Sequence, residues 1–213
     1  MKEIDLTLEK DNTIKKFIVM QNIQSNESEY VFKVDKDGRE IVKEVCEELD
    51  YECEEYESQS GYFIKLKKSS EIKNSVSDTI DLLIPLPPKN VSEKLTNPAI
   101  LTVFIPQIKA VSMLREKVYL LRIKWIISWD TPLTVYDVKI DESRYITRYF
   151  ASQKTPLFTI LFGFDFYITS EGSGSRIKMK EWYKGPFKYL AKNEIEKHLK
   201  KARESLPEVL IKI

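Results

Sequence analysis

The sequence predicts an α+β protein: a curved antiparallel sheet wrapped around a long C-terminal helix, preceded by a small two-layer α/β sandwich. Three observations predict it. Five or six segments after residue 72 alternate apolar and polar residues, one long amphipathic helix closes the chain, and strand and helix patterns alternate before residue 68. One-sided alternation is typical of an antiparallel sheet with one solvated face, so the other face needs a cover.

Composition bounds the class of protein. With 213 residues, 42% hydrophobic and 31% charged, the chain predicts one large or two small packed domains rather than disorder. No apolar run approaches the ~20 residues of a membrane span, and the N-terminus lacks the apolar core of a signal peptide. We therefore expect a cytoplasmic protein without a transmembrane segment. The Lys/Glu bias and only six glycines are typical of thermophile proteins.

Cysteine and histidine are scarce. Cys46 and Cys53 predict free thiols in a reducing compartment and exclude a disulfide framework. Cys46 is expected in a helix core, and the glutamates around Cys53 are expected to raise its pKa. A single histidine, His198, excludes a histidine-built metal site, so we expect neither a metal nor a cofactor.

The near-neutral chain has an uneven charge distribution. Residues 1–68 carry 11 Lys and Arg against 17 Asp and Glu, a net of −6, and residues 69–213 carry 23 against 16, a net of +7. Two readings stay open: two units that attract each other or a protein partner of the acidic N-terminal domain, or simply two solvated surfaces.

The N-terminal part predicts β-α-β-α-β and ends at the polar stretch from Lys67 to Glu71. Its expected elements are a strand through Ile4, Leu6 and Leu8, a helix over Thr13 to Ile23 on the spacing of Ile14, Phe17 and Ile18, a strand Tyr30 to Val34, a helix after Asp37-Gly38 on the spacing of Ile41 to Leu49, and a strand Tyr62 to Leu66 after the Ser60-Gly61 turn.

From Tyr30 to Lys67, in the order strand, Asp35-Lys36-Asp37, helix, Tyr51-Glu52, strand, this part resembles the TusA/SirA-like sulfur-carrier fold. That family carries sulfur on a cysteine of a Cys-Pro-x-Pro motif at the start of the first helix. This chain has Asp11-Asn12-Thr13-Ile14 there, with neither cysteine nor proline. The resemblance therefore implies a degenerate carrier domain over residues 1–68, retained for interaction.

The C-terminal part predicts a sheet and one covering helix. It is expected to begin with a strand Ser77 to Ile84, a helix from Pro87-Pro88 to Thr96 and a helical turn Ala99 to Ile105. The sheet is expected to continue with a strand that has Tyr119 to Trp129 on one face, a turn at Asp130-Thr131-Pro132, a strand with Thr134, Tyr136, Val138 and Ile140 on one face, and a strand Arg144 to Ala151. The last expected elements are an apolar stripe Phe158 to Ile168, a hairpin at Gly172-Ser173-Gly174, a strand with Ile177, Met179, Glu181 and Tyr183 on one face, and a final helix whose apolar face runs from Phe187 and Leu190 to Leu206.

The passage Leu95-Thr96-Asn97-Pro98, closed by Pro106, resembles one in the START/SRPBCC (helix-grip) superfamily, nearest the branch that contains polyketide cyclases and an accessory protein of carbon-monoxide dehydrogenase. The resemblance covers about two thirds of the chain, residues 72–213. It implies a cavity between the sheet and the last helix that holds a hydrophobic small molecule or a lipid. The expected cavity residues are Phe104, Trp125, Trp129, Tyr149, Phe162, Phe164, Phe166, Met179, Glu181, Ile195, His198 and Leu199.

Each group of candidate residues has more than one interpretation. The aromatic residues line a pocket or simply fill the core. The i, i+4 pair Glu194 and His198 anchors a ligand, acts as an acid–base pair, or is an ion pair at the helix boundary. Glu181 points inward and pairs with Arg144 or Arg148, or a bulge turns it outward and Trp182 inward.

The function that follows is non-enzymatic binding of an apolar molecule. The alternatives are a polyketide cyclase/aromatase-like enzyme using Glu181, Tyr149 or His198, and an accessory or assembly protein. The lysines of the last helix alternate with Glu194, Glu196 and Glu204, which is typical of a solvated face, so we expect no nucleic acid partner.

Overall fold

The computed structural model describes residues 2–23, 29–49, 51–67, 75–124, 128–154 and 158–212, with the backbone alone for Lys2, Thr13, Phe17, Gln21, Glu48, Leu49 and Lys154. Contacts divide the chain into two compact units, Met1–Asn74 (unit 1) and Ser75–Ile213 (unit 2). Of the expected boundary stretch from Lys67 to Glu71, only Lys67 is among the described residues, and Trp125 and Ile127 also lie outside them.

Unit 1 is a two-layer sandwich of one sheet and two helices. In chain order its elements are β1 (Lys2–Asp5), α1 (Asn12–Ile23), β2 (Glu29–Val34), α2 (Lys36–Leu49), β3 (Glu52–Ser58) and β4 (Gly61–Lys67). The sheet order is β1-β2-β4-β3, with β1 parallel to β2 and the other pairs antiparallel. In register, Phe32, Ile64 and Glu55 lie side by side, and Arg39 of α2 forms an ion pair with Glu55.

Three expectations for unit 1 are wrong. Leu8 lies beyond β1 and is 85% exposed. The acidic strand β3, with every residue exposed, was not predicted, because it lacks the alternation that marks a half-buried strand. The buried face of α1 carries Lys15, Val19, Met20 and Ile23 rather than Ile14 and Ile18, since a charged residue occupies a position that periodicity reads as polar surface.

The expectation of two free thiols is also wrong. Cys46, at 5% exposure near the end of α2, is joined by a disulfide to Cys53 of β3. Their Cα atoms lie 6.4 Å apart, within the usual range for a disulfide. The bond links the helix layer to the edge strand, and Cys53 has no free thiol whose pKa the neighbouring glutamates would raise.

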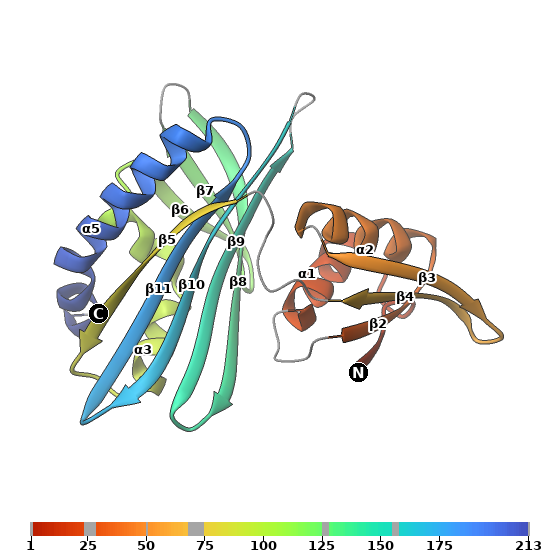
Figure 1. The fold of residues 1–213 in the computed structure, drawn as a ribbon, viewed down its shortest axis with the longest axis horizontal. Coiled ribbons are helices and arrows are strands. Elements are labelled where there is room, and N and C mark those ends of the chain that lie inside the picture. Colours follow the sequence, from red (N-terminus) through yellow and green to blue (C-terminus); the bar gives the residue numbers. More distant parts are fainter. Residues whose placement is uncertain are drawn as a thin grey trace. The chain divides into compact units, whose positions relative to one another are not determined.

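Unit 2 is a seven-stranded antiparallel sheet with helices on its inner face. Its elements are β5 (Val76–Ile84), α3 (Pro88–Leu95), the 3-10 turn η1 (Pro98–Ile100), α4 (Leu101–Phe104), β6 (Ile108–Arg115), β7 (Val118–Lys124), β8 (Ser128–Asp141), β9 (Arg144–Lys154), β10 (Thr159–Glu171), β11 (Gly174–Lys184) and α5 (Lys188–Lys212). The strand order is β5-β11-β10-β9-β8-β7-β6. The predicted helix-grip fold is confirmed, with seven strands instead of five or six (Figure 1).

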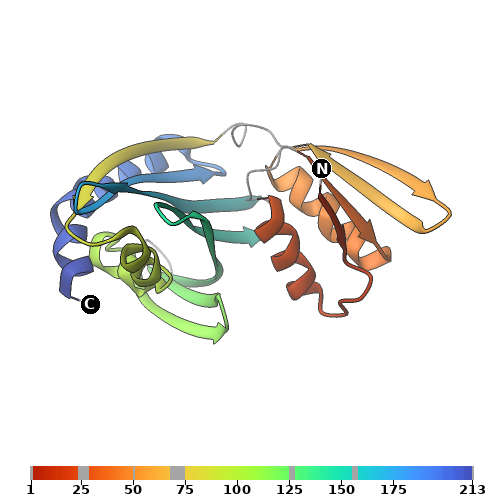
Figure 2. The ribbon, with the colours of Figure 1, turned by 90° about the horizontal axis from the view of Figure 1, so that it is seen from below.

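The passage from Leu95 to Pro106 forms the expected short helices. Pro88 begins α3, where its missing N–H costs no helical hydrogen bond, and the Asn97 side chain accepts from Ala99 N at the start of η1. Leu95, Leu101 and Phe104 are fully buried. Figure 2 shows α3 and α4 on the concave side of the curved sheet.

α5 packs mainly on β5, then on α4 and on β11. Its buried residues recur every three or four positions and are Ile195, His198, Leu199, Ala202, Leu206 and Leu210. Phe187 precedes the helix with a positive φ of 62° and is 67% exposed, and Leu190 is 50% exposed. The buried face therefore begins at Ile195, about two turns after Phe187, and continues past Pro207 to Leu210.

The strand boundaries between residues 108 and 141 differ most from the prediction. The predicted turn at Asp130-Thr131-Pro132 is wrong, because these residues lie within β8 and pair with β7. Arg122 holds Asp130 with two hydrogen bonds of 3.0 and 3.1 Å across the strands, and Thr131 is fully buried. The inner face of β8 is consequently Trp129, Leu133 and Val135, one residue out of step with the predicted face.

Candidate functional site

The inner face of unit 2 gathers the predicted cavity residues. Phe104, Tyr149, Phe164, Phe166, Met179, Ile195 and Leu199 belong to one buried cluster, with Trp129 and Phe162 packed against it. Glu181 and His198 are buried beside this cluster, and Trp125 lies outside the described residues. The expected residues come from α4, four strands and α5, which the fold brings to one place.

The aromatic rings at the centre contact one another. Phe164 meets Phe104 at 6.1 Å and Tyr149 at 6.3 Å between ring centroids, both edge to face, and Tyr149 meets Phe166 at 5.3 Å. Such contacts are favourable beyond the burial of area alone. Of the two readings of these aromatic residues, these ring contacts support core packing at Phe104, Tyr149, Phe164 and Phe166.

Tyr149 has its hydroxyl committed to the fold. The group donates to the carbonyl of Leu95, at the C-terminal end of α3. Burial raises the pKa of Tyr149 well above its usual value. A hydroxyl that is held by a backbone carbonyl and resists ionisation is a poor acid or base, which removes one of the three groups proposed for an enzyme.

Five polar side chains form a chain of contacts where β11, α5 and the residue before β6 meet. His198 Nδ1 lies 2.9 Å from Glu181 Oε1, and His198 Nε2 lies 3.0 Å from Gln107 Oε1. Gln107 Nε2 donates to Glu194 Oε2 at 2.6 Å, and Lys197 donates to the other oxygen of Glu194 at 2.7 Å. The cluster thus runs from a buried carboxyl to an exposed lysine.

The cluster fixes one proton. Because the Glu194 carboxylate only accepts, Gln107 turns its amide nitrogen toward it and its amide oxygen toward His198. His198 Nε2 therefore carries a hydrogen and donates to Gln107. The contact between Nδ1 and Glu181 Oε1 then holds one shared proton, either on the carboxyl or on the imidazole.

The electrostatics of the two carboxyls are opposite. Burial raises the pKa of Glu181, and the hydrogen bond from His198 opposes this only in part. The hydrogen bond from Lys197 lowers the pKa of the less buried Glu194. Glu181 Oε2 is buried and has no hydrogen-bond partner among the described residues. Such an oxygen is rare in proteins and costs free energy unless something meets it.

The structure resolves the alternatives for Glu181. Its side chain points inward from β11, and the pairing with β10 is unbroken from Leu161 to Glu171, so there is no bulge. Trp182 lies on the opposite face, where its ring occupies the space a Cβ on Gly163 would fill. The expected partners are wrong: Arg144 pairs with Asp141 and Arg148 with Asp165, and His198 takes their place.

The predicted pair Glu194 and His198 is present but indirect. His198 Nε2 and Glu194 Oε2 are 3.9 Å apart, and Gln107 hydrogen-bonds to both. Gln107 was missed as a site residue. It lies 91 positions from His198, and only its place directly after Pro106 could have drawn attention to it.

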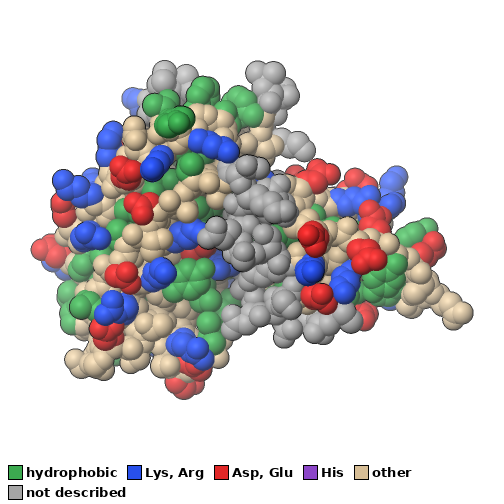
Figure 3. Space-filling view, viewed as in Figure 1, with side chains coloured by type: hydrophobic (Ala, Val, Ile, Leu, Met, Phe, Trp, Pro, Cys, Tyr) green, Lys and Arg blue, Asp and Glu red, His purple; other side chains and the backbone are tan. Residues whose placement is uncertain are grey.

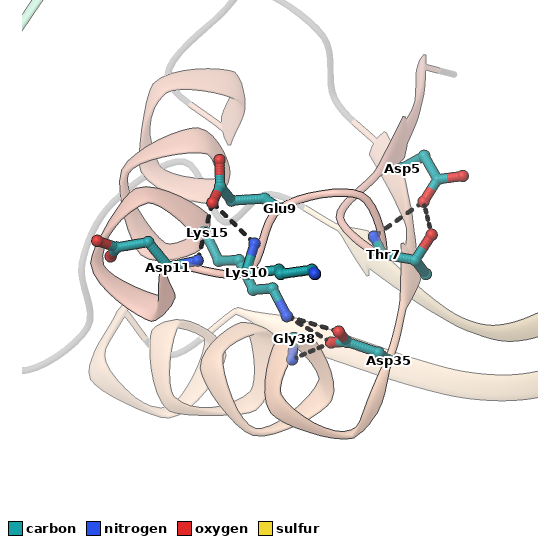
Figure 4. Close-up of polar contacts among 8 residues, drawn as sticks. All are labelled: Asp5, Thr7, Glu9, Lys10, Asp11, Lys15, Asp35 and Gly38. Atoms are coloured by element: carbon teal, nitrogen blue, oxygen red, sulfur yellow. Dashed lines mark hydrogen bonds and ion pairs between the residues drawn. The ribbon is translucent and has the colours of Figure 1, made fainter.

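Unit 1 offers a second polar cluster around the start of α1. Asp11 begins the helix by accepting from Ile14 N at 3.1 Å. Lys15 donates to both oxygens of Asp35 at 2.7 Å, and Asp35 also accepts from Gly38 N at 2.7 Å (Figure 4). The carboxylate neutralises the lysine charge, and both of its oxygens have hydrogen-bond partners.

A pocket of about 180 Å³ opens beside β3 and β4 of unit 1. Its lining includes Tyr56, Tyr62 and Glu55, and Glu55 is held by Arg39 and Lys43 at 2.6 Å each.

Across the described ranges, no three His, Cys, Asp or Glu side chains lie close enough to hold a metal ion. None of the helices in those ranges has the length and apolar character to cross a membrane.

The charged surface of unit 2 is mixed. Lys192, Lys197, Lys200, Lys201 and Arg203 are all exposed along α5, with Glu196 and Glu204 between them. Basic and acidic side chains are interspersed over the face of unit 2 drawn in Figure 3. This is the solvated helix face that the alternation of charge predicts.

Comparison with known proteins yields likeness of fold only. No protein-family model and no curated protein matches the chain. A START superfamily protein from Mycobacterium smegmatis is 14% identical, with a TM-score of 0.47 over 65% of this chain and 97% of that one. A conserved protein from Geobacillus kaustophilus is 16% identical, with a TM-score of 0.44 over 62% and 96%. A norcoclaurine synthase mutant from Thalictrum flavumn is 6% identical, with a TM-score of 0.45 over 65% and 95%. Such identities transfer no function.

Proposed function

We propose that unit 2 binds a hydrophobic small molecule or a lipid, without catalysis, between its sheet and α5. One observation carries the proposal: Glu181 Oε2 is buried without a partner among the described residues, beside an otherwise apolar face. Ligand sites in proteins are mostly apolar and contain a few convergent polar groups that orient the ligand. The inner face of unit 2 has both parts.

The pair of Glu181 and His198 supplies the polar anchor in this proposal. Glu181 Oε1 is held by His198, which is held in turn by Gln107, so the carboxyl cannot swing away to find water. The aromatic rings supply apolar contact area. Because Phe104 and Phe164 already pack on each other, binding requires α4 or α5 to move outward from the sheet.

Native mass spectrometry of the full chain purified from its own cells tests the proposal. We expect a co-purifying apolar molecule, released by organic solvent, at up to one per chain. Glu181→Leu should reduce its occupancy, while Lys178→Leu, on the exposed face of the same strand, should not. A wild-type chain that carries no such molecule and takes up none from a lipid extract would refute the proposal.

A second candidate is an acid–base enzyme of the polyketide cyclase/aromatase kind. It is favoured by the 2.9 Å contact between Glu181 and His198, two of the three groups named for that function. A pair that shares one proton can pass it to a bound molecule. Under this alternative, Glu181→Gln would abolish turnover of an aromatic polyketide while leaving its binding measurable.

For unit 1 we propose an accessory role as a degenerate TusA-like domain that contacts a protein partner. Two observations support it: the start of α1 has no cysteine, and the two cysteines present are bonded to each other. The excess of acidic residues favours a basic partner. Pull-down from native cells with the full chain as bait would count against the role if it recovers nothing.

We also propose a cytoplasmic location in a thermophile. Disulfides are rare in the cytosol of mesophiles but are frequent in intracellular proteins of hyperthermophiles. The disulfide of Cys46 and Cys53 is compatible with both proposals together. Thiol labelling of the protein in intact cells tests them, since both cysteines should stay unlabelled until a reductant is added.

A further inference from the structure

Glu181 has one oxygen in use and one free. His198 Nδ1 meets Oε1 at 2.9 Å, and no described group meets Oε2. The free oxygen is buried, so solvent does not reach it from the surface. Whatever binds there has to offer a hydrogen, because a carboxyl oxygen in this position accepts.

The surrounding hydrogen bonds decide the charge of the pair. Gln107 requires a hydrogen on His198 Nε2, so an ionised Glu181 would face a doubly protonated imidazolium. Burial favours the alternative in which both groups are neutral and Oε1–H donates to Nδ1. The raised pKa of Glu181 agrees with this arrangement. Oε2 is then a neutral carbonyl oxygen.

We infer that the molecule bound in unit 2 is an apolar alcohol or phenol, whose hydroxyl donates to Glu181 Oε2. The inference rests on the proposed binding function and narrows it to one class of ligand. A fatty acid fits less well, because at neutral pH it must take up a proton before its carboxyl can donate, and as a carboxylate it would place a second acceptor and a negative charge against Oε2. A hydrocarbon leaves Oε2 unmet.

An ammonium group would also donate, but it would bring a charge into an apolar site. To compensate it, Glu181 would have to ionise and pass its proton to His198, leaving two positive groups around one carboxylate. Burying such a set costs more than burying a neutral hydroxyl. The neutral donor therefore fits this site better than the cation.

Four probes with the same ten-carbon body test the inference: decanol, decylamine, decanoate and decane. Their affinities for the full chain are measured by displacement of a fluorescent apolar dye. We expect decanol to bind about tenfold tighter than decane and decanoate, since a site built to meet a hydroxyl discriminates against analogues that lack it. In Glu181→Leu that advantage should vanish while decane still binds, and Lys178→Leu should keep it.

The outcomes separate the inference from the proposed function. If all four probes bind wild type equally, or decylamine or decanoate binds most tightly, the inference is wrong and the binding function stands. If none binds, both are wrong. Equal binding of decanol and decane is also what an ordered water on Oε2 would produce.

A spectroscopic measurement keeps the test independent of whether Glu181→Leu folds. The infrared carbonyl band of a buried protonated carboxyl should shift when decanol binds to wild type and should not shift with decane. The same band should be absent from Glu181→Gln. A wild-type spectrum with no protonated-carboxyl band at neutral pH would overturn the neutral pair on which the inference depends.

Discussion

The two units bury an ionisable pair in opposite ways. In unit 1, Lys15 is 1% exposed and holds both oxygens of Asp35, whose side chain is still 41% exposed. In unit 2, the side chains of Glu181 and His198 are 9% and 10% exposed, and one carboxyl oxygen has no partner among the described residues. An ion pair whose hydrogen-bonding atoms all have partners stabilises a fold, whereas a pair with one unpartnered acceptor is available to a ligand.

The pKa directions follow the same division. The hydrogen bond from Lys15 lowers the pKa of Asp35, while burial raises the pKa of Glu181. The first carboxyl is held as an anion by its lysine, and the second is favoured as a neutral acid by its surroundings. The comparison predicts that loss of the Asp35 carboxyl acts mainly on the stability of unit 1, whereas loss of the Glu181 carboxyl acts mainly on binding by unit 2.

The largest effect is expected from Asp35→Ala. It leaves the buried Lys15 without a counter-charge and removes the acceptor for Gly38 N, so unit 1 should lose about 3 kcal/mol of stability. Amide hydrogen exchange of α1 and α2 measures it, because none of the three tryptophans lies in residues 1–74. Asp35→Asn keeps the cap and loses the charge, so it should fall between wild type and Asp35→Ala. Losses below about 1 kcal/mol for both would show that the pair is not structural.

His198→Leu should have a smaller effect. It leaves the whole Glu181 carboxyl and the Gln107 amide oxygen without their partner, which should cost unit 2 about 2 kcal/mol. Tryptophan fluorescence during urea unfolding reports on this unit, since Trp125, Trp129 and Trp182 all lie in it. Lys201→Leu on the exposed face of α5 is the control, and an equal change in both variants would contradict the prediction.

Glu181→Leu should change the stability of unit 2 by less than about 1 kcal/mol, because it removes an unmet acceptor together with a useful one. The double variant Glu181→Leu/His198→Leu should lose less stability than His198→Leu alone. Urea unfolding of the four chains completes a double-mutant cycle. A cost for Glu181→Leu equal to that of Asp35→Ala would mean that both pairs are structural, and the contrast between the units would fail.

The smallest expected effects are on the pH dependence of stability, and Asp35 and Glu181 contribute to it with opposite signs. The lowered pKa of Asp35 gives stability that is present above its ordinary value of 3.8 and lost as the pH falls through the folded value. The raised pKa of Glu181 gives stability that is present below its ordinary value of 4.5 and lost as the pH rises through the folded value. Carboxyl ¹³C NMR should place the titration midpoint of Asp35 below 3.8 and that of Glu181 above 4.5. Midpoints on the same side would contradict the comparison.

Much of the fold of unit 2 follows from periodicity. The stripe Phe162 to Ile168 and the face of Ile177, Met179 and Glu181 are where alternation predicts them, because each strand contacts the core on one side only. The strands β6 and β3 were not predicted, since edge strands are mostly exposed and lose the apolar signal. The turn at Asp130-Thr131-Pro132 failed because the cross-strand pair of Arg122 and Asp130 overrides a local turn preference.

The site was predictable only as far as local spacing reaches. The pair Glu194 and His198 is four residues apart on one helix, so the helical period shows it. Glu181 was recognised because a charge on an apolar face is conspicuous. Its partner and Gln107 come from segments that are distant in sequence, and a single chain gives no signal that joins them. Lys15 was missed for the same reason, since Asp35 lies 20 positions away.

The strand order of unit 2 has a consequence for its synthesis. The first strand, β5, pairs only with the last, β11, so Ile84 has no partner strand until Ser175 has been synthesised. The inner face waits longer still, since Ile195 to Leu210 are the last of its residues to leave the ribosome. Folding that depends on such distant contacts is slow and exposes apolar surface meanwhile. The same C-terminal segment that completes the anchor of Glu181 therefore also ends the period in which the nascent chain is most prone to aggregate.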